Sequence, residues 1–197
     1  TRHVSVADIN GDGRPDVIAA NRGGPAGTES FVCFGAADAL LQHPCTVVYR
    51  GSATTITPAD MDGDGDLDLV IPHRDGGQSE LRLNSGAGVF TDRKVFGPKN
   101  VGYRSAAVAD FDQDGFMDVA IIAPGSRTGI ETPGPDGGSG VIAAPRRGIF
   151  YGGPNVEFGS LQLLRESTER PYSILAADVD GDGRTDLIVG HVEAQPV

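Results

Sequence analysis

The stretch that decides the fold is Ala59-Asp60-Met61-Asp62-Gly63-Asp64-Gly65-Asp66-Leu67-Asp68, followed directly by Leu69-Val70-Ile71. If Asp60 is position 1, acidic side chains stand at positions 1, 3, 5 and 9, and Gly65 stands at position 6. This spacing lets a curled loop aim alternate side chains at one point, and glycine permits the sharp turn that the curl needs. Ca²⁺ takes about six to eight oxygen ligands, so the loop predicts a calcium site.

Three further segments align with this loop without gaps, and they begin at Asp8, Asp110 and Asp178. Position 7 varies between arginine, aspartate and phenylalanine, which fits a ligand that is a backbone carbonyl. The predicted metal ligands, position 7 included, are Asp8, Asn10, Asp12, Arg14, Asp16, Asp60, Asp62, Asp64, Asp66, Asp68, Asp110, Asp112, Asp114, Phe116, Asp118, Asp178, Asp180, Asp182, Arg184 and Asp186.

Charge supports about four Ca²⁺ ions, one for each loop. Positions 1, 3, 5 and 9 carry fifteen carboxylates, because Asn10 replaces one aspartate, and packing them without a cation would be strongly repulsive. Four Ca²⁺ ions would change the net charge from −11 to −3. The alternative is a set of solvated acidic turns, since Asp-Gly is a common turn dipeptide. Four loops that each lie at the same place between two predicted strands favour metal sites over solvated turns.

The loops are not EF-hands. An EF-hand carries glutamate at position 12 and lies between two helices. Position 12 here is Ala19, Ile71, Ile121 or Val189, and both flanks of each loop are strand-like.

Short apolar runs on both sides of each loop predict two buried strands, A and B, and two further strands, C and D, follow in each full repeat. The predicted A and B strands are Val4–Val6 and Val17–Ala19, Thr55–Thr57 and Leu69–Ile71, Ala106–Val108 and Val119–Ile122, and Ile174–Ala176 and Leu187–Val189. The predicted C and D strands are Ser30–Phe34 and Thr46–Arg50, Glu80–Asn84 and Val89–Phe96, and Gly148–Tyr151 and Ser160–Arg165.

The first aspartates of the loops are 52, 50 and 68 residues apart, and a period near 50 indicates a propeller or a solenoid. We predict an all-β fold of four-stranded antiparallel β-propeller blades, about three and a half in this chain. Residues 1–197 form a single domain whose repeats are approximately 1–52, 53–102, 103–170 and an incomplete 171–197. The third repeat is longer because of Gly125–Arg147, which we predict to be a long loop between strands B and C.

Three and a half blades leave sheet edges that a closed ring would remove. Two explanations stay open. The chain is a piece of something longer, as its start at Thr1 suggests, or a second copy supplies the missing strands.

The Asp-x-Asp/Asn-x-Asp-Gly-x-x-Asp loop, followed by a β-branched strand, resembles the FG-GAP/VCBS repeat family, which includes the propeller of integrin α-chains. The resemblance covers nearly the whole chain. It implies a seven-bladed ring of four-stranded blades, Ca²⁺ in the A–B loops of one face, and ligands on the opposite face. The resemblance does not identify one function, because the family includes adhesion receptors, lectins and modules attached to enzymes.

Cys33 and Cys45 fall on adjacent strands of the first repeat, so they form either a disulfide or two buried thiols. The calcium loops point to a secreted or cell-surface protein, and that setting favours the disulfide. The acidic chain lacks a basic cluster for nucleic acid, and no apolar window is long enough to span a membrane.

No catalytic motif is present, so we expect no enzyme activity. The predicted function is a secreted calcium-binding module acting in protein or glycan binding, adhesion or self-assembly, with structural Ca²⁺. Its partners would be a protein or glycan ligand, further copies of the chain, or missing segments that complete the propeller. The alternative is the non-catalytic propeller portion of a larger extracellular enzyme.

Overall fold

The computed structural model describes residues 1–23, 28–38, 41, 44–75, 77–99, 101–123, 130–133, 139–142, 147–164 and 170–192. Apart from one short 3-10 turn, η1 (Pro154–Val156), the regular structure in these residues is antiparallel β-sheet. The predicted all-β class is therefore confirmed.

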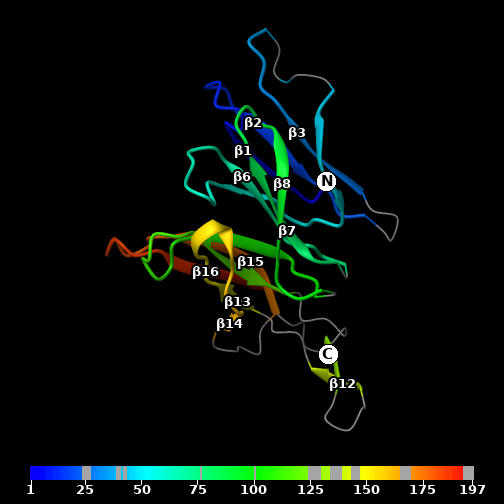
Figure 1. The fold of residues 1–197 in the computed structure, drawn as a ribbon, viewed down its shortest axis with the longest axis vertical. Coiled ribbons are helices and arrows are strands. Elements are labelled where there is room, and N and C mark those ends of the chain that lie inside the picture. Colours follow the sequence, from blue (N-terminus) through cyan, green and yellow to red (C-terminus); the bar gives the residue numbers. More distant parts are fainter. Residues whose placement is uncertain are drawn as a thin grey trace.

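Three four-stranded sheets form the first three blades, in the chain order that the repeat predicts (Figure 1). The first contains β1 (His3–Ala7), β2 (Asp16–Ala20), β3 (Thr28–Cys33) and β4 (Thr46–Gly51). The second contains β5 (Thr57–Ala59), β6 (Asp68–Ile71), β7 (Ser79–Asn84) and β8 (Phe90–Phe96). The third contains β9 (Ser105–Ala109), β10 (Asp118–Ile122), β13 (Arg147–Phe150) and β14 (Gln162–Leu163). The fourth repeat supplies the pair β15 (Arg170–Ala177) and β16 (Asp186–Val192).

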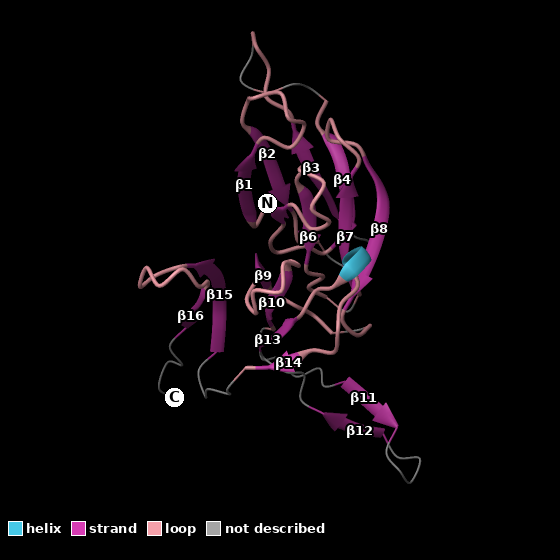
Figure 2. Cartoon of the chain, turned by 60° about the vertical axis from the view of Figure 1, so that its left-hand side comes forward, coloured by secondary structure: helices cyan, strands magenta, loops and turns pink. Residues whose placement is uncertain are grey.

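The prediction for Gly125–Arg147 as a long loop is wrong in part. Strands β11 (Ile130–Pro133) and β12 (Ser139–Ile142) pair there as an antiparallel hairpin (Figure 2). The backbone ladder forms although the segment lacks the alternating apolar pattern from which strands are recognised in a sequence. The rest of 125–147, apart from Arg147 at the start of β13, lies outside the described residues. The predicted D strand Ser160–Arg165 also shortens to Gln162–Leu163.

The core lies between neighbouring blades, so the strands β6 and β10 of the two inner blades are buried on both faces. In β6, Leu69 and Ile71 pack toward the first blade, whereas Val70 packs toward the third. In β10, Val119 and Ile121 face the second blade, and Ala120 and Ile122 face β15 and β16. Side chains alternate between the two faces of a strand, so burial of both faces requires the continuous apolar runs that follow each acidic loop.

The outward faces of the terminal blades remain exposed. Val4 and Val6 on β1 are 52% and 62% exposed, and Leu175 on β15 is 59% exposed. In the inner blades the matching strand residues are covered by a neighbour. The described residues thus form a stack with two unpartnered ends.

Candidate metal-binding loops

The four acidic loops share one strand register. Each is closed by an alanine at the end of strand A that pairs with the position-9 aspartate at the start of strand B. These pairs are Ala7 with Asp16, Ala59 with Asp68, Ala109 with Asp118, and Ala177 with Asp186. The sheet therefore holds the two ends of every loop at the same separation.

Hydrogen bonds within the loops repeat as well. In the second loop, the Gly65 amide donates to Asp60 Oδ2 at 3.1 Å, and the Asp66 amide donates to Asp64 Oδ1 at 2.9 Å. The same two bonds, from position 6 to position 1 and from position 7 to position 5, recur in the other three loops at 2.7–3.0 Å. These backbone donors wind each loop around its own carboxylates.

Two positions of each loop need a left-handed backbone. Position 6 is the expected glycine, and position 4 also has positive φ in every loop. Gly63 occupies position 4 of the second loop with φ +77°, whereas Gln113 occupies it in the third with φ +63°. A residue with a Cβ is strained in this region, so the third loop carries backbone strain that the others lack.

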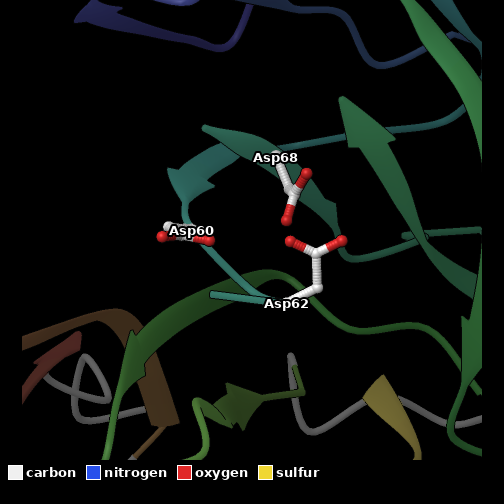
Figure 3. A group of neighbouring side chains, drawn as sticks. All are labelled: Asp60, Asp62 and Asp68. Atoms are coloured by element: carbon white, nitrogen blue, oxygen red, sulfur yellow. The ribbon is translucent and has the colours of Figure 1, made fainter. Parts of the chain in front are cut away.

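The aspartates at positions 1, 3 and 9 converge in the second, third and fourth loops, whereas the first loop has Asn10 at position 3 and forms no such group of three carboxylates. In the second loop Asp60, Asp62 and Asp68 each place a carboxylate oxygen within 4.8 Å of the others, and Figure 3 shows Asp62 and Asp68 facing one another. The corresponding groups in the third and fourth loops are Asp110, Asp112 and Asp118, and Asp178, Asp180 and Asp186.

The position-9 aspartate also ties the loop to strand C. Asp68 accepts hydrogen bonds from the Met61 amide at 2.9 Å and from the Asn84 amide at 2.7 Å. Asp16 and Asp118 accept the equivalent pairs of bonds from the loop and from the amides of Gly35 and Gly152, which lie shortly after the ends of β3 and β13. All three aspartates have no exposed surface.

The protonation properties of these carboxylates reflect burial and crowding. Burial raises the pKa of Asp68 to about 6 against the two backbone hydrogen bonds, and the nearby charges of Asp62 and Asp64 add to the rise. Burial raises the pKa of Asp62, and the negative charge of Asp64 adds to the rise. Burial also raises the pKa of Asp118, and the negative charges of Asp112 and Asp110 add to the rise. A cation among these oxygens would stabilise their ionised forms.

Some predicted ligands lie outside these converging groups. The position-5 aspartates Asp12, Asp64, Asp114 and Asp182 bond instead to the position-7 amides. In the first loop Arg14 also forms an ion pair with Asp12, at 3.0 Å from Nη1 to Oδ2. Ligation by position 5 and by the position-7 carbonyls, including those of Arg14, Asp66, Phe116 and Arg184, stays a prediction.

Sequence reasoning missed Asn84, which lies at the end of β7 and is 2% exposed. Its side-chain amide donates to the Ile9 carbonyl of the first loop at 2.8 Å and to the Leu67 carbonyl of the second at 3.2 Å. The Gln113 side chain likewise lies 3.5 Å from the Gly183 carbonyl of the fourth loop. Residues of the second and third loops line one cavity of about 480 Å³. The four loops therefore lie on one face of the molecule.

The donor set at these positions contains only oxygen. Hard divalent cations select carboxylate and carbonyl oxygens, whereas soft cations select thiolate and imidazole. The converging aspartates of the second, third and fourth loops fit a hard cation, and the first loop shares the same backbone winding.

Two further features bear on the cellular compartment in which the protein folds. Cys33 and Cys45 form a disulfide that closes the connection between β3 and β4, so the disulfide prediction holds over two free thiols. Within the part of the chain that the structure describes, no helix has the length and apolar character to cross a membrane.

Repeated four-stranded blades that stack face to face, with an acidic loop between the first two strands of each, define a propeller-type repeat protein. Known protein families agree with this assignment. A model of the FG-GAP repeat matches residues 1–31, 102–144 and 170–190, and a model of an FG-GAP-like repeat matches residues 60–121. The chain belongs to the FG-GAP repeat family.

A relative is phosphatidylinositol-glycan-specific phospholipase D of Mus musculus, which is 33% identical over 167 residues. That match covers 75% of this chain and 19% of the relative. The chain thus spans less than a fifth of the length of that protein.

Proposed function

We propose that this chain is a non-catalytic, calcium-stabilised propeller module of an extracellular protein that binds a protein or glycan ligand. One observation carries the proposal: aspartates from positions 1, 3 and 9 converge within 4.8 Å in three successive repeats. Each group is held by the same backbone hydrogen bonds and the same strand register. Such repetition supports a selected cation site over scattered surface acids.

Calcium is the cation that best fits these loops. It accepts irregular geometry and more than six oxygen ligands, whereas Mg²⁺ demands a near-ideal octahedron and keeps several waters. Each loop offers clustered side-chain carboxylates together with a carbonyl at position 7. Ca²⁺ bound to the folded state would stabilise it by mass action and would fix the turn between strands A and B.

The disulfide between Cys33 and Cys45 supports an extracellular setting, because disulfides persist in oxidising compartments. The exposed faces at both ends of the stack support assembly. Val4 and Val6 at one end and Leu175 and Ile188 at the other are apolar side chains that a neighbouring blade would cover. Further segments of a longer chain or a second copy would supply that blade.

Thermal unfolding and calorimetric titration test the calcium proposal. The purified chain should melt at a markedly higher temperature in millimolar CaCl₂ than in EDTA, and about four Ca²⁺ ions should bind each chain. Matched MgCl₂ and NaCl separate calcium binding from ionic strength. The same melting curve with and without Ca²⁺ would refute the proposal.

A second candidate is supported by the relative. Phosphatidylinositol-glycan-specific phospholipase D is named as an enzyme, and this chain matches 19% of it. On this proposal the chain is the propeller portion of a larger extracellular enzyme, and the chemistry lies elsewhere. Sequencing the complete open reading frame tests it, because a flanking catalytic domain must then be present.

A further inference from the structure

A basic cavity lies at the ends of the strands remote from the acidic loops. Its volume is about 320 Å³, and its lining includes Arg2, Arg22, Arg74 and Arg104. Arg2 and Arg104 precede β1 and β9, and Arg22 and Arg74 follow β2 and β6. The acidic loops join the opposite ends of those same strands, so acid and base occupy opposite faces of the stack.

The repeat itself places these side chains. Arg2, Thr54, Arg104 and Tyr172 each stand five residues before the alanine that closes the acidic loop of their blade. Arg22 and Arg74 occupy another shared position, six residues after the position-9 aspartates Asp16 and Asp68. All four blades therefore contribute to one cavity from equivalent positions.

The cavity carries positive charge that the described residues do not fully neutralise. Arg22 donates to both carboxylate oxygens of Asp75 at 2.9 Å, and Ser52 also donates to Asp75. Among the residues that the structure describes, none forms an ion pair with Arg2, Arg74 or Arg104. Burial, followed by the charge of Arg22 and then that of Arg104, lowers the pKa of Arg74 against the opposing charge of Asp75. Three guanidinium groups thus face one space on a chain of net charge −11.

Hydroxyl groups with unused hydrogen-bonding capacity line the same cavity. The Oγ1 atoms of Thr54 and Thr55 are buried without a hydrogen-bond partner. A buried hydroxyl without a partner destabilises the structure, so an acceptor that reached these groups after rotation about χ1 would be favoured. Arg104 is fixed on the other side, where its guanidinium carbon lies 3.5 Å from the centre of the Tyr172 ring.

We propose that this cavity binds a multivalent tetrahedral oxyanion, the phosphate or sulfate group of a small molecule or glycan. A planar carboxylate carries one charge and is satisfied by a single guanidinium fork. Three guanidinium groups from different blades, none of them in an ion pair within the described residues, line the cavity together with two hydroxyl groups. They suit an anion that has more charge and oxygens in several directions. The inference rests on the proposed role as a binding module and names the chemical class of its ligand.

Calorimetric titration of the calcium-loaded chain with inorganic sulfate tests the proposal at constant ionic strength. Inorganic phosphate, kept below the solubility limit of its calcium salt, is the second probe, and acetate and chloride are controls. Saturable binding of sulfate or phosphate, with none of acetate, is expected. A sugar phosphate and a sugar sulfate then identify which ester binds more tightly.

Variants locate the site. Arg74→Gln and Arg104→Gln should each weaken oxyanion binding by at least about tenfold, because each removes a charge-assisted contact. Lys99→Gln removes one positive charge from an exposed position outside the cavity and should leave binding unchanged. If a glutamine variant does not fold, Arg104→Lys retains the charge but loses the planar fork, and it should bind with intermediate affinity.

Two results would overturn the proposal: no saturable binding beyond chloride, or equal affinity in the wild type and the arginine variants. The calcium-dependent melting shift is measured on the same samples. A normal shift without oxyanion binding refutes the basic site alone, whereas a missing shift refutes the calcium proposal.

Discussion

The second and fourth acidic loops carry aspartate at the same four positions, 1, 3, 5 and 9, but have different surroundings. Asp68 at position 9 of the second loop is completely buried and accepts two backbone hydrogen bonds, one from the loop and one from strand β7. Asp186 at the same position of the fourth loop is exposed, and its described hydrogen bond comes from the Val179 amide at 3.1 Å.

The difference arises from the blade and not from the loop. The second blade has a third strand whose end, Asn84, reaches Asp68, and blades pack against both of its faces. In the described residues the fourth sheet has two strands, and one of its faces is open. A loop motif therefore specifies the ligands, whereas neighbouring strands decide how rigidly the ligands are held.

The largest expected effect comes from removing the position-9 carboxylate. Asp68→Ala leaves two buried amides without an acceptor and should lower the free energy of unfolding by about 3 kcal/mol. Asp186→Ala exposes one amide to water and should lower the free energy of unfolding by less than about 1 kcal/mol. Urea unfolding in EDTA measures both values without a contribution from calcium. Equal costs would show that burial does not distinguish the two loops.

Calcium affinity should differ in the same direction. The second loop is held in place before the ion binds, so it loses less conformational freedom on binding and should have the lower Kd. At a calcium concentration of about 100 Kd, loss of that site in Asp62→Ala should remove about 2–3 kcal/mol of stability. Asp180→Ala should remove less at the same concentration.

Calorimetric titration checks this order of affinities. Each variant should lose one bound Ca²⁺, the Asp62 variant from the tight sites and the Asp180 variant from the weak ones. Loss of a tight site in the Asp180 variant would contradict the predicted order of affinities.

A smaller effect concerns position 4 of the loops. Gln113 has φ +63° where the other loops have glycine, so Gln113→Gly should raise the free energy of unfolding by about 1 kcal/mol. The reverse change in the second loop, Gly63→Gln, should lower it by a similar amount. Thermal unfolding in EDTA measures both. Stabilisation by both changes would exclude backbone strain as the cause.

The smallest effect lies at the opposite ends of the strands, where Arg22 of the first blade contacts Asp75 of the second. The Arg22 hydrogen bonds, together with that from Ser52, lower the pKa of Asp75 to about 2 from its usual 3.8. The folded state therefore binds the proton less readily than the unfolded state. The ion pair contributes its full stability above pH 4 and loses it as the pH falls toward 2.

A double-mutant cycle of Arg22→Gln and Asp75→Asn isolates this pair. The coupling energy should be less than about 1 kcal/mol at pH 7, because solvent screens a partly exposed pair, and it should decrease as the pH falls toward 2 and vanish below it. Constant coupling down to pH 2 would contradict the assignment.

The sequence by itself determined the repeat, the strands beside each loop and the aspartates that converge. These features are local: an apolar run next to an Asp-Gly loop dictates both strand and turn whatever surrounds it. Asp60, Asp62 and Asp68 were therefore predicted together, and the structure places their carboxylates within 4.8 Å.

Tertiary structure alone decided what depends on contacts between blades. Asn84 is a single polar residue at a strand end, and no local pattern marks it as the bridge between two loops. The arginines of the basic cavity are far apart in the chain, and packing of the blades brings them to one space. The burial that separates Asp68 from Asp186 likewise follows from neighbours that are distant in the sequence, and long-range packing leaves no signature within a ten-residue motif.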